Sequence, residues 1–357
     1  IHPMSGPDTD GDGIVDQCDS EFIVNSNDDS DDGVCNSAHC SLREAILAAN
    51  ANVNGATPDE IQFNIPGAGV KTIQPTTALP FINDPVVIDG STQPGSNCTV
   101  WPPTLQIELS GASAGGASGL VAFVGNNTIR GLVINRFGSA GIYLDGAGNN
   151  TIQCNFIGTD ATGELDRGNV EGIWVNNVGN NIIGGTTPGQ GNLVTANFAD
   201  GLWIVGPNAN DNIVQGNYIG TNATGTTQVG NTSVGIGLSG GNNLIGGPLP
   251  GAANVIVGTN FYGISIFSPS GAFNTIQGNY VGTNAAGSIN LYNLTNGIVI
   301  DTGAHDNSIT GNVIARNNRH GIYILNATSA NNIIQGNWIG TDMSGTANLP
   351  NSQNGIL

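Results

Sequence analysis

The chain alternates short apolar stretches with polar corners that are rich in glycine and asparagine. The stretch at 152–159 reads IQCNFIGT, and close copies of it occur at 214–221, 276–283 and 334–341. A weaker copy, in which asparagine precedes two apolar residues, lies between each pair of strong copies. Internal repetition of this kind is the sequence signature of a repeat architecture.

Two markers define the length of the repeat. The first is a ladder of asparagines, which comprises Asn155, Asn192, Asn217, Asn254, Asn279, Asn312 and Asn337. The second is a glycine followed by Ile or Leu, which recurs from Gly141 to Gly355. The spacing between the two markers alternates, so the unit is one coil of about 25 residues, and every second coil carries an inserted loop.

The apolar stretches predict the strands of a parallel β-helix. Runs of two to four residues are too short for helices and too evenly spaced for a β-sandwich. Gly and Asn accept the positive φ that tight corners need, and an inward asparagine can hydrogen-bond to its copies in adjacent coils. A propeller blade needs longer strands, and a leucine-rich repeat needs a different template. We expect an all-β solenoid of about ten or eleven coils over 61–357.

Composition excludes several other classes of protein. Glycine contributes 55 of 357 residues, whereas charged residues make up only 9%. A coiled coil needs many more charges, and a hydrophobic content of 38% argues against disorder. The net charge of −19 makes nucleic acid a poor partner. No apolar run approaches the roughly 20 residues that are needed to span a bilayer.

The acidic residues are concentrated near the N-terminus, and 1–34 is interpreted as a calcium-binding segment. The stretch 8–19 reads D-x-D-x-D-G-x-x-D-x-x-D, with glycine at the sixth position as in a calcium loop. The expected ligands are the carboxylates of Asp8, Asp10, Asp12, Asp16 and Asp19 and the carbonyl oxygen of Ile14. A second acidic cluster at 28–32 is either a solvated turn or a weak second cation site.

The segment 35–60 is predicted to cover the N-terminal end of the solenoid. Ser41 and Glu44 have the spacing of a capping box, and the apolar residues that follow share one face of a short helix over 41–50. Open ends of a β-solenoid template aggregation, so a helix at this place is well positioned as a cap.

Five cysteines are present, and one pairing is predicted. Cys35 and Cys40 close a small ring just before the helix, and we expect a disulfide there, which indicates an oxidising compartment. Spacing does not pair Cys18, Cys98 and Cys154.

The stretch 40–46, which reads CSLREAI, resembles the signature of the bacterial CSLREAI-domain family of secreted β-helix proteins. Stretches at 61–67, 72–75 and 86–95 also look like that family, so the resemblance covers essentially the whole chain. It implies a right-handed parallel β-helix at a cell surface or in the medium, and it implies no reaction. The acidic loop resembles a thrombospondin type-3 or dockerin-like calcium repeat, because its twelfth position is Asp and no long helices flank it.

Catalytic candidates are weak at the level of sequence. Asp145 and Asp301 occupy the same position after the marker glycine, but five coils separate them, so they do not form the carboxylate pair of a glycosidase. The best cluster contains His320 and Arg319, which would act as base and electrostatic clamp, with Asp301 and Asp306 on an adjacent coil. Polar turn residues are the favoured interpretation of this cluster.

The inserted loops are more regular than any candidate active site. Loops such as 159–163 and 221–225 should line one side of the solenoid, with one aromatic residue before each loop. These aromatic residues are Phe156, Tyr218, Tyr280 and Trp338. We favour packing of these rings beneath the loops over an exposed glycan-binding stripe.

The repetition favours a structural or adhesive role at a bacterial cell surface, as a rod or as part of a filament. The alternative is a polysaccharide lyase or a glycoside hydrolase. The expected partners are further copies of the chain, stacked end to end, or surface glycans. The coil that begins at 354–357 carries no cap, which favours either a longer native chain or such stacking.

The calcium assignment is testable on the intact chain. Because five carboxylates repel one another without a cation, titration with calcium should release heat with saturable binding in calorimetry. Absence of binding in a calcium-free buffer would contradict the assignment.

Overall fold

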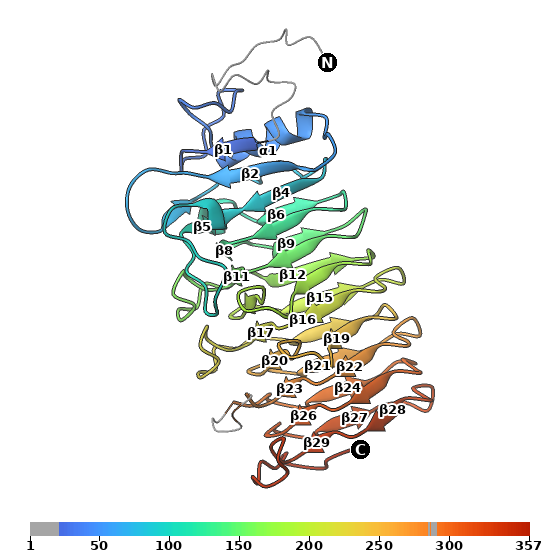
Figure 1. The fold of residues 1–357 in the computed structure, drawn as a ribbon. Coiled ribbons are helices and arrows are strands. Elements are labelled where there is room, and N and C mark those ends of the chain that lie inside the picture. Colours follow the sequence, from blue (N-terminus) through green and yellow to red (C-terminus); the bar gives the residue numbers. More distant parts are fainter. Residues whose placement is uncertain (1–20, 285, 287–290) are drawn as a thin grey trace.

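The computed structural model describes residues 21–284, 286 and 291–357, and this part of the chain is a right-handed parallel β-helix (Figure 1). Successive coils lie one below another from the N-terminal to the C-terminal end. A full coil contributes one short strand to each of three parallel sheets, which we call sheets A, B and C. The fold class expected from the repeat is therefore confirmed.

Within the described residues, the three sheets contain eleven, ten and eight strands, respectively. Sheet A comprises β1 (Glu21–Val24), β2 (Asp59–Phe63), β4 (Val86–Asp89), β7 (Thr128–Arg130), β10 (Thr151–Gln153), β13 (Ile182–Gly184), β16 (Ile213–Gln215), β19 (Leu244–Gly246), β22 (Thr275–Gln277), β25 (Ser308–Thr310) and β28 (Ile333–Gln335). Sheet B comprises β3 (Lys71–Ile73), β5 (Ile107–Ser110), β8 (Leu132–Asn135), β11 (Phe156–Ile157), β14 (Leu193–Val194), β17 (Tyr218–Ile219), β20 (Val255–Ile256), β23 (Tyr280–Val281), β26 (Val313–Ile314) and β29 (Trp338–Ile339). Sheet C comprises β6 (Leu120–Ala122), β9 (Ala140–Leu144), β12 (Glu171–Asn176), β15 (Leu202–Val205), β18 (Ile236–Leu238), β21 (Ile264–Ile266), β24 (Ile298–Ile300) and β27 (Ile322–Ile324). Two short 3-10 helices follow β4 and β5, at Gly90–Thr92 and Gly111–Ser113.

The core is built from apolar side chains that stack on their counterparts in the next coil. In sheet A the middle position of each strand from β7 to β25 is Ile or Val, beginning with Ile129 and ending with Ile309, and each of these side chains is fully buried. Burial of one such side chain contributes roughly 1.5–3 kcal/mol. One spacing between coils therefore allows both backbone hydrogen bonding between parallel strands and stacking of apolar side chains in the core.

Buried asparagines join neighbouring coils at the corners. The seven asparagines of the sequence ladder form one column at the corner between sheets A and B, where Asn192 Nδ2 donates to Asn217 Oδ1 at 2.9 Å. Two further columns occupy the other corners. The column before sheet A comprises Asn127, Asn150, Asn181, Asn212, Asn243, Asn274, Asn307 and Asn332. The column before sheet C comprises Asn169, Asn197 and Asn231 and, after Thr259, Asn293, Asn317 and Asn351.

The N-terminal end of the core is covered by α1 (Leu42–Ala51), which lies beside β1 and β2 (Figure 1). Ser41 and Glu44 complete the capping box: the Glu44 N–H donates to Ser41 Oγ at 3.2 Å, and the Ser41 N–H donates to Glu44 Oε2 at 2.8 Å. The buried face of the helix contains Leu42, Ala45, Ile46 and Ala49. The predicted helical cap is confirmed.

The structure extends the solenoid into 21–24, which is part of the segment 1–34 that the sequence predicts to bind calcium. β1 pairs in parallel with β2 and is the first strand of sheet A. The Arg43 guanidinium donates to both carboxylate oxygens of Asp29, at 2.9 and 3.1 Å, and the Thr76 N–H donates to Asp29 at 2.9 Å. Part of the cluster at 28–32 therefore packs against the cap.

Two disulfides are present among the described residues. Cys35–Cys40 is the predicted one. The second, Cys98–Cys154, joins the loop after β4 to the corner after β10, two coils further along sheet A. The sequence left this pair open because the path of the loop after β4 cannot be read from spacing. None of the helices in the described ranges is long and apolar enough to cross a bilayer.

Removal of one corner amide should destabilise the whole fold. Asn217 is fully buried, donates to Asn254 and to the carbonyls of Ile183 and Gln215, and accepts from Asn192. Because Asn217→Ala leaves several buried groups unsatisfied, we expect it to lower the free energy of unfolding by about 3 kcal/mol or more in denaturant titrations.

Asn208→Ala is the matched control, since this exposed asparagine should change stability by only about 0.5 kcal/mol. Equal stabilities of the two variants would contradict a stabilising role of the column.

Candidate functional site

Three aromatic side chains lie on the outer face of sheet C in consecutive coils. Trp174 on β12 is in register with Tyr143 on β9 and with Trp203 on β15, and all three are half-buried. The next strand carries Gly237 at this position, and a Cβ there would lie 2.2 Å from the ring of Trp203. Trp203 thus occupies the space over the glycine and stacks on Phe267, with 5.2 Å between ring centroids. We call Tyr143, Trp174 and Trp203 the aromatic column.

The rings of the column support one another. Tyr143 and Trp174 meet edge to face, with centroids 5.1 Å apart and planes at 81°, which is a favoured arrangement of aromatic pairs. The column runs along the axis of the solenoid because it takes one ring from each coil. Rings fixed in this way offer flat apolar surfaces beside polar groups, which suits a ligand with both characters.

A polar cluster lies at one end of these strands. The Tyr143 hydroxyl donates to Asp145 Oδ2 at 3.0 Å, and Asn176 Nδ2 donates to the same oxygen at 3.1 Å and to the Tyr143 oxygen at 3.0 Å. Burial, together with the hydrogen bond to Asp145, raises the pKa of Tyr143, so its hydroxyl stays protonated. The cluster places a carboxylate and an amide beside the aromatic column, where they can bind hydroxyl groups.

A pair of carboxylates lies at the start of the same strands. Glu171 and Asp200 each precede the marker glycine in adjacent coils, so they stack at one corner. The Asp200 N–H donates to Glu171 Oε2 at 2.8 Å, and the Val234 N–H donates to Asp200 Oδ1 at 2.7 Å. Each carboxylate therefore accepts from the backbone of the next coil.

The pKa of Glu171 is raised to about 7, mainly by burial and to a smaller extent by the charge of Asp200, against the lowering effect of the backbone hydrogen bond from Asp200. Burial also raises the pKa of Asp200. A carboxylic acid that is still half protonated near neutral pH can act as a general acid. Glu171 lies three residues before Trp174 on β12, which is roughly 10 Å along the strand.

Sequence reasoning missed this pair. At the level of sequence, we considered acidic residues four places after each marker glycine. The two that occur there, Asp145 and Asp301, lie in distant coils. The informative position was the one directly before the glycine, where Glu171 and Asp200 occur in consecutive coils. The signal was weak because neighbouring coils have Ala140 and Val234 there, as the register shows.

The four weak catalytic candidates do not converge on one site in the described structure. His320 is buried, its Nδ1 accepts from the Asn354 N–H at 3.2 Å, and its own N–H donates to Asn296 at 3.0 Å. Asp306 pairs with His305 at 2.6 Å, before β25, whereas Asp301 binds Asn326 after β24. Arg319 makes a backbone hydrogen bond to Thr295. These contacts are those of corner residues.

The aromatic residues before the inserted loops pack beneath them. Phe156 is buried, and Tyr218 is half-buried with Trp101 stacked on it at a centroid distance of 4.6 Å. Trp101 belongs to the disulfide-linked loop after β4 and also meets Phe156 edge to face. These rings therefore belong to small apolar clusters and form no exposed stripe on that side.

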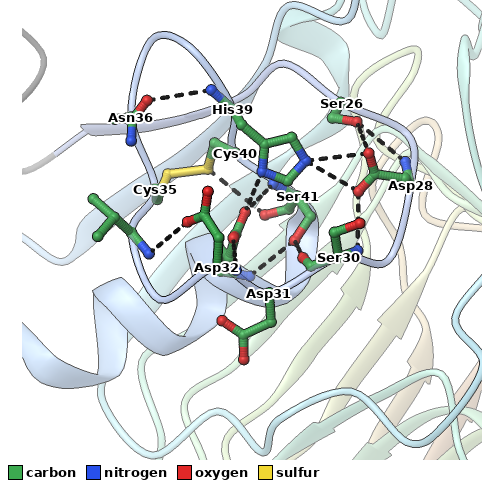
Figure 2. A network of polar contacts seen from close by, with 12 residues as sticks. Ser26, Asp28, Ser30, Asp31, Asp32, Cys35, Asn36, His39, Cys40 and Ser41 are labelled. Carbon is green, nitrogen blue, oxygen red and sulfur yellow. Dashed lines mark hydrogen bonds and ion pairs between the residues drawn. A yellow bond between two sulfur atoms is a disulfide. The ribbon is translucent and has the colours of Figure 1, made fainter.

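One group of described side chains could hold a metal ion. Asp32, His39 and Glu44 place one ligand atom each within 4.8 Å of one another, close to the Cys35–Cys40 disulfide (Figure 2). The expected calcium ligands are Asp8, Asp10, Asp12, Ile14, Asp16 and Asp19, and they lie outside the described residues, as does Cys18.

The His39 ring lies between Asp28, which is outside this group (Figure 2), and Glu44, which belongs to it. Its Nε2 lies 3.1 Å from Asp28, and its Nδ1 lies 3.0 Å from Glu44 Oε2. The hydrogen bond to Asp28 raises the pKa of His39 against the opposing effect of burial, and the charge of Glu44 adds to the rise. Burial works to raise the pKa of Asp28, but hydrogen bonds from Ser26, Ser30 and His39 outweigh it and lower this pKa to about 2. A protonated His39 thus ties the acidic turn to the cap.

Comparison with known proteins finds similarity in fold only. No protein-family model and no curated protein matches the chain in sequence. Among solved structures, the Azotobacter vinelandii mannuronan C-5 epimerase AlgE6 A-module is 13% identical, with 93% of this chain and 97% of that chain covered and a TM-score of 0.45. A mutant of the periplasmic alginate epimerase AlgG is 13% identical over 76% of this chain, with a TM-score of 0.40, and the match spans 60% of that chain. Pectate lyase Pel9A is 16% identical over 89% of this chain and 72% of that chain, with a TM-score of 0.34.

These matches correct one expectation. The sequence favoured a structural or adhesive rod, in a filament or stacked end to end, but the solved structures named above are epimerases and a lyase of polysaccharides. The structural interpretation is not carried further, and end-to-end stacking has no support. At such low identity the likeness establishes the fold alone, so the function has to be argued from the residues of this chain.

The two disulfides indicate an oxidising, non-cytoplasmic compartment.

The N-terminal cap should respond to pH through His39 and Asp28. The contribution of Asp28 is present above its ordinary pKa of 3.8 and is lost as the pH falls toward about 2. The contribution of His39 is present below its ordinary pKa of 6.5 and is lost as the pH rises through its raised value.

We therefore expect His39→Gln to destabilise the protein most between about pH 4 and 6.5, and least at pH 9, in thermal unfolding followed across pH. His305→Gln is the control, since that ring lies far along the chain beside Asp306. A destabilisation by His39→Gln that is the same at all pH values would contradict the ionic role of His39.

Proposed function

We propose that this protein is a secreted, polysaccharide-active enzyme, a glycoside hydrolase that holds its substrate along the outer face of sheet C. The observation that carries the proposal is the half-buried aromatic column on sheet C, together with Glu171 at the start of β12, whose pKa burial raises to about 7. Secretion is supported by the two disulfides.

The aromatic column is the proposed binding surface for the sugar rings. Coils follow one another at about 4.8 Å, so Tyr143, Trp174 and Trp203 form a rigid strip parallel to the axis. The faces of pyranose rings that carry C–H groups are apolar and stack on aromatic rings, while their hydroxyls need hydrogen-bond partners. Asp145 and Asn176, at the end of the same strands, are placed to supply those partners.

Glu171 is the proposed general acid. In this mechanism its carboxyl group donates a proton to the oxygen of the glycosidic bond as that bond breaks. Asp200, one coil away, is the second carboxylate. The backbones of adjacent coils lie about 4.8 Å apart, and from this spacing we infer retention of configuration at the cleaved sugar, because retaining glycosidases hold their two carboxyls about 5 Å apart.

We further propose that the acidic loop at 8–19 binds calcium and stabilises the N-terminal end of the secreted protein. This assignment rests on the order of its oxygen ligands and on its resemblance to calcium repeats.

The test is cleavage of a panel of acidic and neutral polysaccharides, with calcium present. We expect release of reducing ends without unsaturated ends, at a rate that falls as the pH rises through about 7 because Glu171 must be protonated. Glu171→Gln should lower kcat by roughly 10²–10⁴-fold, the usual effect of losing a general acid. Trp174→Ala should instead raise KM by about tenfold.

Two controls are matched to these variants. Glu164→Gln changes an exposed glutamate of an inserted loop, and Trp338→Ala changes a tryptophan of sheet B; both should retain the parent kinetics. Unsaturated products would contradict a hydrolase, and a Glu171→Gln variant with parent kcat would contradict the role of Glu171.

A further inference from the structure

A second candidate site lies away from sheet C. A cavity of about 370 Å³ opens beside sheet A, between the loop after β4 and the loop after β13. Its polar lining comprises Thr99, Arg130, Gln153, Thr187 and Gln190. The size is in the range of pockets that bind small molecules, and only one of these side chains is charged.

The walls of this cavity are fixed by covalent and steric constraints. The Cys98–Cys154 disulfide attaches the loop after β4 to the coil that carries Gln153. Gly189 has a φ of +85°, and a Cβ on it would lie 2.0 Å from the carbonyl oxygen of Cys98, so only glycine lets the two loops meet. The Cys154 N–H donates to the Gln190 carbonyl at 3.1 Å. The cavity is therefore formed before any ligand arrives.

The guanidinium group of Arg130 has N–H donors that are not used by the described residues. Its Nη2 donates to Ser91 Oγ at the long distance of 3.4 Å, and its Nε lies 3.4 Å from Asp89 Oδ1 without the geometry of a hydrogen bond. Asp89 Oδ1 already accepts from the Ser91 N–H at 2.9 Å and from the Ser91 hydroxyl at 2.5 Å. A guanidinium group has five N–H donors, so most of those of Arg130 lack a partner among the described residues.

The uncharged walls also keep hydrogen-bonding capacity. Gln153 uses its Nε2 for the Gly184 carbonyl at 2.8 Å, which leaves its Oε1 as an acceptor. Gln190 uses its Oε1 for the Thr187 N–H at 3.2 Å, which leaves its amide N–H groups as donors. Unused hydrogen-bond donors and acceptors thus surround the guanidinium group of Arg130, the one charged group of this lining.

We propose that this cavity binds a sugar carboxylate, that is, a uronate residue. A planar carboxylate matches the fork of a guanidinium group through two parallel hydrogen bonds, and Arg130 has the free donors for it. The amides and hydroxyls around Arg130 match the hydroxyl groups of the sugar ring. An inorganic anion would use Arg130 and leave Gln153 and Gln190 without a role. The proposal goes beyond cleavage at sheet C and names a second subsite, for acidic sugars.

The test is calorimetry on the intact protein with glucuronate, glucose and inorganic sulfate as separate probes. We expect glucuronate to bind at least tenfold more tightly than glucose, which shares its hydroxyls at C1 to C4 but has a hydroxymethyl group in place of the carboxylate, and more tightly than sulfate. Arg130→Gln should weaken glucuronate binding at least tenfold. Arg167→Gln, which changes the arginine of an inserted loop, should leave it unchanged.

Because Arg130 contacts Asp89, a second variant guards against a folding defect. Gln190→Ala leaves that ion pair intact and should also weaken glucuronate binding, with an unchanged midpoint of thermal unfolding. Equal affinity for glucose and glucuronate, or an Arg130→Gln variant with parent affinity, would overturn the proposal. So would sulfate binding as tight as that of glucuronate and unaffected by Gln190→Ala.

The outcome is separable from that of the hydrolase proposal. Trp174→Ala removes a ring on sheet C and should leave glucuronate binding intact, whereas Arg130→Gln should leave the cleavage of neutral polymers intact. Glucuronate binding without any polysaccharide cleavage would overturn the hydrolase alone.

Discussion

From the coil of β7 onward, the structure depends on hydrogen bonds between buried side chains, mostly asparagine amides, that are stacked at the three corners of the coils. An amide can donate to the copy in the next coil and accept from the copy in the preceding coil, and it can also satisfy a backbone carbonyl at the turn, as Asn254 does with Asn279 and Val214. An unpaired buried amide would be costly, so a coil that slipped by one residue would lose these bonds at every corner. The amides thus fix the register in which the apolar columns meet. Sheets A, B and C follow from that register.

The repeat could be predicted from the sequence because the turns and short strands of each coil are determined by residues that are close together in the chain. Glycine, asparagine and short apolar stretches recur wherever a coil turns, so the fold, the helix over 41–50 and the Cys35–Cys40 disulfide could be predicted. The candidate site was harder to predict because it depends on register between coils. Trp174 and Trp203 are separated by an inserted stretch, and only the pairing of β12 with β15 aligns them. The Cys98–Cys154 pairing likewise depends on the three-dimensional path of a long loop.

The face with the candidate site is where the repeat is least regular. Most positions on the inside carry Ile or Val in coil after coil, because like side chains pack well on one another. The outer position of sheet C changes from Tyr143 through two tryptophans to Gly237 within four coils. The corner before it changes in the same region, where Glu171 and Asp200 occur. Burial of these two acids raises the pKa of Glu171 to about 7, a cost that packing alone does not require.

The Cys98–Cys154 bond has a mechanical consequence. In a solenoid each coil contacts only its neighbours, so loss of structure can spread from an end one coil at a time. This bond skips the coil of β7 and fastens the coil of β4 to that of β10. Unravelling that starts at either end meets a covalent clamp there, and the clamped coils must open together or stay closed. Under pulling or partial proteolysis the protein should behave as a short rigid block with one longer, sequentially unwinding tail.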